Sequence, residues 1–409
     1  MVQRRDHSRV LIYSHDSFGL GHLRRCRAIA HALVDRNEDM TVLILSGSPI
    51  IGSFGFKRRV DFVRVPGVIK LRNGEYTSQH LKLDTDETLA LRASIIRHTA
   101  EVFDPDLFIV DKEPLGLRGE VRETLELVRD RGHHTVLGLR DVMDDAKLLA
   151  PEWERKHAMP ALEDLYDSIW VYGLPQICDP LEGIVVPTTV RKKMVYTGYL
   201  RREASGRDLP HPVSMDGPFI LVTPGGGGDG EELVDWVLRA YETDRNMEYP
   251  ALIVLGPFMQ LDRQQEFQRR AAALSDVVVE TFDSQLEDVM ARAVGVVAMG
   301  GYNTFCEILS FDKRAILVPR VRPRLEQFIR ASRAEQIGLV RMLPPDEGTD
   351  ALAMIRALRT LPYQKRPSEA VIPGLLEGLE SVDKLTARAL RGGAEIVLPA
   401  FARSAAGAE

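Results

Sequence analysis

Short runs of Val, Ile and Leu alternate with amphipathic helical patterns along most of the chain, and this alternation constrains the fold more than any other feature. Runs without interleaved polar residues are typical of strands buried on both faces, in parallel sheets covered by helices. We therefore expect an α/β protein with doubly wound sheets. The expected strands are 10–14, 41–46, 62–65, 107–110, 135–139, 169–172, 219–223, 252–256, 277–280, 294–299 and 315–319. The expected helices are 22–36, 86–102, 119–131, 231–241, 263–274, 304–310, 324–337 and 350–361.

A polar stretch rich in charge, glycine and proline, residues 201–212, divides this pattern into two halves. Such composition is typical of a linker between domains. We predict a first domain over 1–200, a linker over 201–215, a second domain over 216–385 and a loose alanine-rich tail over 386–409. A cleft between two doubly wound domains is the expected ligand site.

Composition excludes several classes of protein. The net charge of −6 over 409 residues argues against a dedicated nucleic-acid binder. Three scattered cysteines do not make a disulfide framework or a zinc site, and Asp144 and Asp145 lack a third ligand at suitable spacing, so no metal is expected. There is no apolar run long enough to span a membrane and no signal peptide, so the expected location is cytoplasmic.

The turn after the first expected strand contains Gly19 and Gly21, followed by His22 at the start of a helix. Glycines let the backbone approach a ligand, and the positive end of the helix dipole points the same way. Arg24 stands where the dinucleotide fingerprint needs its third glycine, which weakens an NAD interpretation. His22, with an ordinary pKa near neutrality, is a candidate general base. The alternative is a capping or packing histidine.

Two glycine-rich loops follow strands in the second half and are candidates for holding phosphates. The first comprises Gly225, Gly226, Gly227 and Gly228, with no Walker lysine after it, and the alternative is a mobile surface turn. The second begins with Gly300 and Gly301, and Asn303 or Thr304 is expected to cap the helix that follows. Glu307, one turn into that helix, could accept hydrogen bonds from a ribose or simply favour the helix dipole.

Three more polar groups follow strands. Asp111 and Lys112 follow one strand of the first half, and Arg140 and Asp141 follow the next. They are expected to bind an acceptor or to assist His22, unless they are solvated loop charges. In the second half, Glu326 and Gln327 open a helix after a basic loop and could grip sugar hydroxyls, unless they are a solvated helix start.

Taken in order, these motifs resemble glycosyltransferases of the GT-B fold, and most closely the MurG-type family 28 group and the predicted glycosyltransferases related to it. The resemblance implies two Rossmann-like domains, with the acceptor on the first and a nucleotide sugar on the second. It also implies a set of roles for particular residues. His22, with Asp111 and Asp141, would lie at the reacting centre, and Gly19, Gly21, Arg24, Lys112 and Arg140 on the acceptor side. The diphosphate would lie on Gly225–Gly228 and on Gly300, Gly301, Asn303 and Thr304, the ribose on Glu307, the base beside Phe282, and the sugar on Glu326 and Gln327.

The resemblance implies an inverting, metal-independent transfer from a nucleotide sugar, most simply a UDP-sugar, with no cofactor. The residue eight before Glu307 is Met299, so the paired glutamates of many retaining enzymes are absent, which favours inversion. The acceptor is not identified and could be a small molecule, a glycan or a lipid-linked sugar; the basic and aromatic segment 51–71 would suit peripheral membrane contact. The alternatives are a UDP-sugar hydrolase, an epimerase or a non-catalytic nucleotide-sugar binding protein.

Overall fold

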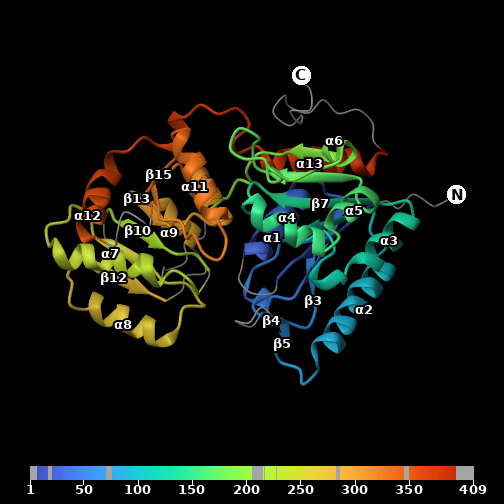
Figure 1. Ribbon diagram of the computed structural model, residues 1–409, viewed down its shortest axis with the longest axis horizontal. Coiled ribbons are helices and arrows are strands. Elements are labelled where there is room, and N and C mark those ends of the chain that lie inside the picture. The colour runs from blue at the N-terminus through green and yellow to red at the C-terminus, as the bar shows by residue number, and fades with distance from the viewer. Residues whose placement is uncertain are drawn as a thin grey trace. The chain divides into compact units, whose positions relative to one another are not determined.

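The computed structural model describes residues 7–16, 21–70, 76–204, 215, 217–226, 228–281, 286–344 and 350–392. The chain forms two compact units, Met1–Leu200 with Pro373–Glu409, and Arg201–Ile372. Each unit is a parallel sheet with helices packed on it (Figure 1). The predicted α/β class with two doubly wound domains is confirmed.

The sheet of the first unit has seven strands in the order β3-β2-β1-β6-β7-β8-β9, all parallel. Its strands are β1 (Ser8–Ser14), β2 (Met40–Ser46), β3 (Val60–Arg64), β6 (Leu107–Asp111), β7 (His134–Arg140), β8 (Ser168–Tyr172) and β9 (Met194–Tyr196). A separate antiparallel pair is formed by β4 (Val68–Lys70) and β5 (Tyr76–Ser78).

The direction of the strand order reverses at β1, which lies between β2 and β6. Tyr13 of β1 pairs with Val110 of β6, so the carboxyl ends of these two strands lie next to each other. Such a switch point leaves a crevice at the carboxyl edge of a doubly wound sheet, because the two connections depart in opposite directions. The residues that follow β1 and β6 are therefore brought together, although they are far apart in the chain.

Seven helices are described in the first unit: α1 (Gly21–Arg36), α2 (Thr85–Phe103), α3 (Arg122–Asp130), α4 (Ala146–Arg155), α5 (Ala158–Asp164), α6 (Thr188–Lys193) and α13 (Gly378–Leu390). In Figure 1 the red α13 lies among the blue and green elements of this unit. It packs against α1, and Asn37 donates a hydrogen bond to Asp383 at 2.7 Å.

The position of α13 corrects the predicted domain bounds of 216–385 and the separate tail of 386–409. The chain returns to the first unit at Pro373. Backbone contacts hold the returning segment in place. The Tyr199 amide donates a hydrogen bond to the Leu375 carbonyl at 2.8 Å. The backbones also approach closely at Gly378, where a Cβ would lie only 2.6 Å from the Tyr199 carbonyl oxygen. This helix packs by long-range contact, which the local pattern does not reveal.

The sheet of the second unit has six parallel strands in the order β12-β11-β10-β13-β14-β15. They are β10 (Ile220–Thr223), β11 (Ala251–Val254), β12 (Val277–Glu280), β13 (Gly295–Ala298), β14 (Arg314–Leu317) and β15 (Arg341–Met342). The helices described here are α7 (Glu231–Thr243), α8 (Leu261–Ala271), α9 (Leu286–Arg292), α10 (Tyr302–Ser310), α11 (Glu326–Gln336) and α12 (Ala351–Thr360).

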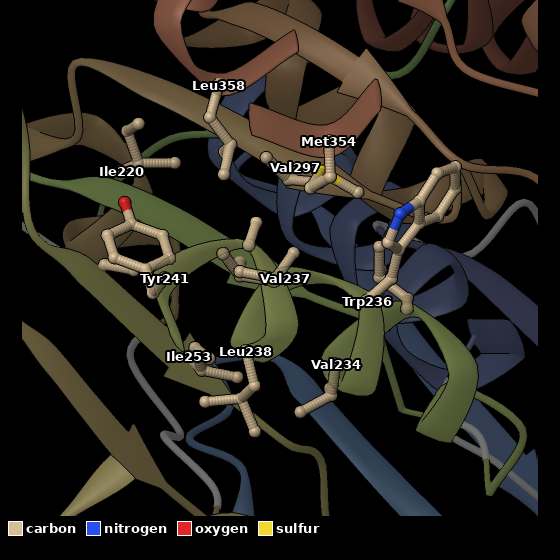
Figure 2. Packing of buried hydrophobic residues seen from close by; sticks show 14 of the residues in the cluster. Ile220, Val234, Trp236, Val237, Leu238, Tyr241, Ile253, Val297, Met354 and Leu358 are labelled. Atoms are coloured by element: carbon tan, nitrogen blue, oxygen red, sulfur yellow. The ribbon is translucent and has the colours of Figure 1, made fainter. Parts of the chain in front are cut away.

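The core of this unit lies between the sheet and the neighbouring helices α7 and α12 (Figure 2). Trp236 and Val237 of α7 lie close to Met354 of α12, and buried strand residues such as Val297 lie next to Met354. The wide apolar face of α7 explains why this segment is helical and covered on that side. All strands expected from the sequence are present, and only the short β4, β5, β9 and β15 were not expected.

A buried ion pair lies beneath the switch point of the first unit. Arg92 of α2 donates from Nε and Nη2 to the two carboxylate oxygens of Glu120, at 2.6 and 2.7 Å, and both side chains are 1% exposed. The Tyr13 hydroxyl donates to the same carboxylate at 2.5 Å, and Arg92 also donates to the Pro66 carbonyl at 2.5 Å. One guanidinium thus ties α2 to the loops that follow β3 and β6.

We expect Arg92→Met to lower the free energy of unfolding of the first unit by about 3–5 kcal/mol, because it leaves the Glu120 carboxylate buried without its cation. The double variant Arg92→Met/Glu120→Gln should recover much of that loss. Urea unfolding is followed by tryptophan fluorescence in a Trp236→Phe background. The two remaining tryptophans, Trp153 and Trp170, are buried in the first unit, so the signal reports on that unit alone. A single variant as stable as its parent would contradict this assignment.

Candidate functional site

His22 and Asp111 form a pair at the carboxyl edge of the first sheet. His22 is in the first turn of α1 and Asp111 is the last residue of β6. His22 Nδ1 and Asp111 Oδ2 are 2.5 Å apart. Arg25, one turn further along α1, donates from Nε to Oδ1 at 2.8 Å and from Nη2 to Oδ2 at 2.7 Å. The spacing of three residues puts His22 and Arg25 on one face of the helix, so both reach the same carboxylate.

The charges of this pair follow from burial and from Arg25. Burial lowers the pKa of His22 from 6.5 to about 4, although the negative charge of Asp111 opposes it. Burial alone would raise the pKa of Asp111, but Arg25 and His22 outweigh burial and hold that pKa well below its usual range. At neutral pH the imidazole is neutral and the carboxylate is ionised.

We assign the proton of the neutral imidazole to Nδ1, because an ionised carboxylate only accepts hydrogen bonds and Asp111 Oδ2 is 2.5 Å from that nitrogen. Arg25 Nη2 also lies 3.1 Å from Nδ1. Nε2 then carries the lone pair and can accept a proton. The side chain of His22 is 18% exposed and that of Asp111 only 2%, so the histidine is the member of the pair that a substrate can reach.

Further polar groups surround the pair. The ring of His15 lies 5.7 Å from that of His22, and burial lowers the pKa of His15 to about 3, so it is also neutral. The buried Glu113 accepts a hydrogen bond from Lys156 at 2.8 Å. Lys112, between Asp111 and Glu113, has a left-handed backbone (φ 70°), which is costly for a residue with a side chain.

The other residues predicted for this side are placed as follows. Asp141 is fully buried and accepts hydrogen bonds from the Tyr199 hydroxyl at 2.8 Å and the Val142 amide at 2.8 Å, so the structure pairs it with Tyr199, not with His22. β7, which precedes Asp141, is one strand further from β1 than β6 is. Arg24 and Arg140 are half-buried, and Gly21 is the exposed first residue of α1.

In the second unit the two glycine loops follow adjacent strands, since β13 pairs directly with β10. Gly225 and Gly300 have φ of 94° and 79°, a region that only glycine adopts freely. A Cβ on Gly225 would lie 3.9 Å from Thr304 Oγ1, which brings the first loop close to the start of α10. Gly226 is half-buried and Gly228 is exposed, so the loop borders accessible space.

The N-terminus of α10 differs from the prediction. Gly301 is its N-cap residue and no side chain caps it, so Asn303 and Thr304 lie inside the first turn and the expectation that one of them caps the helix is wrong. Asn303 Oδ1 instead accepts a hydrogen bond from Arg202 Nη2 at 2.8 Å. Arg202 is 8% exposed, and within the described ranges its Nη1 has no hydrogen-bond partner. A positive charge thus lies beside the N-terminal turn of α10.

The start of α11 is tied to the first glycine loop. Arg320 donates from its backbone to Gln327 Oε1 at 3.1 Å and from Nη2 to Glu326 Oε1 at 3.2 Å, and it also pairs with Asp229. The predicted sugar-binding pair Glu326 and Gln327 is therefore joined to the loop predicted to hold phosphate.

Glu307, predicted to bind a ribose, is completely buried on α10. Three other predicted residues, Gly19, Gly227 and Phe282, lie outside the described residues.

Several contributors to these sites were not predicted. Arg25 could have been found from its spacing of three residues from His22 on a helix. Asp16 and His15 directly follow β1 and lie next to the predicted turn, but no motif marks them. Arg202 was assigned to a linker because of its polar neighbours, and only its contact with Asn303 shows it to be part of the second unit.

Within the described ranges, no three His, Cys, Asp or Glu side chains cluster as metal ligands would. Over the same ranges, no helix is long and apolar enough to cross a membrane.

We expect substitutions of the two partners of His22 to move its pKa in opposite directions. Asp111→Asn removes a negative charge that favours the imidazolium, so the pKa should fall further below 4; Arg25→Met removes a positive charge and should raise it. NMR titration of labelled histidines measures both. His31, elsewhere on α1, is the internal control and should keep its pKa of about 4. Shifts of the same sign in both variants would refute this electrostatic account.

The chain is similar in part to known proteins. Residues 219–358 match the model of the glycosyltransferase family 28 C-terminal domain. A search of curated protein sequences found no match.

Among solved structures, the chain is similar to a UDP-glucosyltransferase from Polygonum tinctorium that glucosylates indoxyl, with a TM-score of 0.61 and 13% identity over 95% of this chain and 100% of that one. It is also similar to the calicheamicin glycosyltransferase CalG4, with a TM-score of 0.58 and 13% identity over 95% of this chain and 99% of that one. Its similarity to Acinetobacter baumannii MurG has a TM-score of 0.52 and 12% identity over 94% of this chain and 95% of that one. At such identities the likeness shows the fold, here shared over both units. The family model thus covers part of the second unit, and both units share the fold of these solved glycosyltransferases.

Proposed function

We propose that this protein transfers a sugar from a nucleoside diphosphate sugar, UDP-linked in the first instance, to an acceptor hydroxyl with inversion and without a metal. The observation that carries the proposal is the pair of His22 and Asp111. It offers a neutral imidazole that a substrate can reach, with Nδ1 held by an ionised carboxylate. A neutral imidazole oriented by a carboxylate can act as a general base.

In the proposed reaction, the acceptor oxygen attacks the anomeric carbon from the face opposite the diphosphate. The acceptor proton passes to His22 Nε2, the new oxygen–carbon bond forms, and the bond from carbon to the diphosphate oxygen breaks with its electron pair leaving on the nucleotide. Asp111 stabilises the imidazolium that results, and Arg25 keeps Asp111 ionised and in place.

The second unit supplies groups that suit the leaving diphosphate. The N-terminus of α10, the backbone of the glycine loop at Gly225 and the buried guanidinium of Arg202 all favour negative charge. Fixed donors of this kind stabilise a leaving group by charge, which is the role a metal ion has in other transferases. This supports transfer without a metal.

The nature of the nucleotide is proposed from the relatives. One similar structure is a UDP-glucosyltransferase, another holds UDP-2-fluoroglucose, and a third, VinC, holds dTDP. Thermal shift with UDP-, dTDP- and GDP-sugars separates these options, because a ligand that binds only the folded state raises the melting temperature by mass action.

Replacing His22 by Ala is expected to reduce kcat by about 100- to 10,000-fold, the usual contribution of a positioned general base, with UDP affinity nearly unchanged. Product formation and isothermal titration with UDP measure the two effects. His31→Ala, on the same helix, is the matched control and should keep full turnover. Near-normal transfer by His22→Ala would remove this residue from the base role.

The same assay distinguishes the alternatives. Release of free sugar from the donor without acceptor would indicate a hydrolase, and a new UDP-sugar an epimerase. Nucleotide binding without turnover across donor and acceptor panels would indicate a non-catalytic binding protein.

Substitution of Arg202 by Met should weaken binding of UDP by about 10- to 100-fold, because a hydrogen bond to a charged group contributes about 1.5–3 kcal/mol. Arg201→Met is the matched control, since Arg201 is the exposed neighbour, and its affinity should stay within about twofold of the parent. Equal affinities of the two variants would show that Arg202 does not bind the diphosphate.

Peripheral contact with an anionic membrane is part of the proposal because the acceptors of MurG-like enzymes are often lipid-linked. Exposed Lys57 and Arg58 lie beside half-buried Phe54 and Phe56, and the Arg27 guanidinium lies 5.5 Å from the Phe54 ring. Flotation with anionic and neutral vesicles tests this contact.

A further inference from the structure

Asp16, which follows β1, is a buried carboxylate that joins three elements of the first unit. It is 3% exposed. Its Oδ2 accepts hydrogen bonds from the Ser14 hydroxyl of β1 and the Ser46 hydroxyl of β2, both at 2.6 Å. Its Oδ1 accepts from the backbone amide of Leu23 at 3.1 Å. Leu23 is the residue after His22, so this carboxylate holds the turn of α1 that carries the histidine.

The close packing around Asp16 shows that its position is built into the fold. A Cβ on Gly47 would lie 2.7 Å from the Asp16 carbonyl oxygen and 2.9 Å from Arg92 Nη1. Glycine at 47 therefore lets the end of β2 approach Asp16. Two carboxylates flank the first turn of α1: Asp111 binds the side chain of His22, and Asp16 binds the backbone beside it.

We propose that Asp16 is a positioning residue. Its carboxylate anchors the first turn of α1 to the ends of β1 and β2. Protonation of that carboxylate weakens the anchor and changes the position and surroundings of the His22 side chain. The catalytic consequence rests on the proposed function of His22, but the anchoring does not.

The charge state of Asp16 changes within an accessible pH range. Burial raises its pKa from 3.8 to about 6, the negative charge of Asp111 on β6 adds to that rise, and the bonds from Ser14, Ser46 and the Leu23 amide oppose it. The other ionisable groups around it are Cys26 on α1, whose pKa burial raises well above its usual value, and Arg92 of α2 across Gly47. Neither titrates near pH 6.

Protonation changes what this carboxyl group can accept. The ionised form takes two hydroxyl donors on Oδ2 and an amide on Oδ1, whereas a protonated group must itself donate one bond. One serine hydroxyl then has to turn, and the bond to the α1 amide weakens because the acceptor no longer carries charge. The pKa of Asp16 is above its unfolded value, so the protonated form is the one the fold stabilises, and stability is lost as pH rises from about 4 through 6. The anchoring of the α1 turn that carries His22 has the opposite pH dependence, because the ionised carboxylate binds the α1 amide more strongly than the protonated one.

Histidine-labelled full-length protein tests this inference by NMR titration between pH 5 and 8, with His22 assigned by His22→Gln. We expect a shift of the His22 signals with a midpoint near pH 6, distinct from the protonation of His22 itself near pH 4. His15, Asp111 and Glu113 have pKa values moved down and away from this range. Asp16→Asn should abolish the midpoint near 6, and Ser46→Ala should move it to higher pH because a bond that favours ionisation is lost.

Asp35→Asn, at the exposed far end of α1, is the matched control and should leave the midpoint unchanged. If Asp16 had a purely structural role, Asp16→Asn would be less stable than the parent, but the titration of the His22 signals would be unchanged. A midpoint that persists in Asp16→Asn, or one missing from the parent, overturns the proposal. With a working transfer assay, turnover of the parent should fall below pH 6 and that of Asp16→Asn should not. Full transfer by His22→Ala would refute the proposed function instead, and would leave the titration result standing.

Discussion

The parallel pairing of β1 with β6 is the constraint on which the first unit's candidate site depends. These strands adjoin although nearly a hundred residues separate them, and the strand order reverses beside them. Their carboxyl ends deliver His15, Asp16 and α1 from one strand, and Asp111, Lys112 and Glu113 from the other. The contacts of His22 with Asp111 and of Asp16 with Leu23 follow from this one adjacency.

The second unit repeats the construction with different chemistry. β10 adjoins β13, and the loops that follow them are rich in glycine. Backbone amides and guanidinium groups dominate here: Arg202 reaches Asn303, Arg330 donates to the Gly300 carbonyl at 2.9 Å, and Arg320 joins Asp229 to Glu326. One unit thus presents proton-transfer groups, and the other presents groups suited to an anion.

Burial and charge act in opposite directions on the two carboxylates beside α1. Asp111 has a guanidinium partner and stays ionised despite burial. Among the described residues the donors to the Asp16 carboxylate are all neutral, and its pKa rises to about 6. A charged partner is needed to outweigh the loss of water around a buried carboxylate, and hydroxyl donors alone do not suffice. The same buried edge of the sheet therefore holds one permanent charge and one that can change.

The sequence by itself determined the α/β class, the main strands, the glycine loops and His22 as a candidate base, because these depend on local patterns of residues. It did not distinguish Asp111 from Asp141, since each follows a buried strand. Only the tertiary structure decided between them, because β6 lies against β1 and β7 is one strand further away. The return of α13 to the first unit and the contact of Arg202 with Asn303 were likewise decided by long-range packing, which no local pattern records.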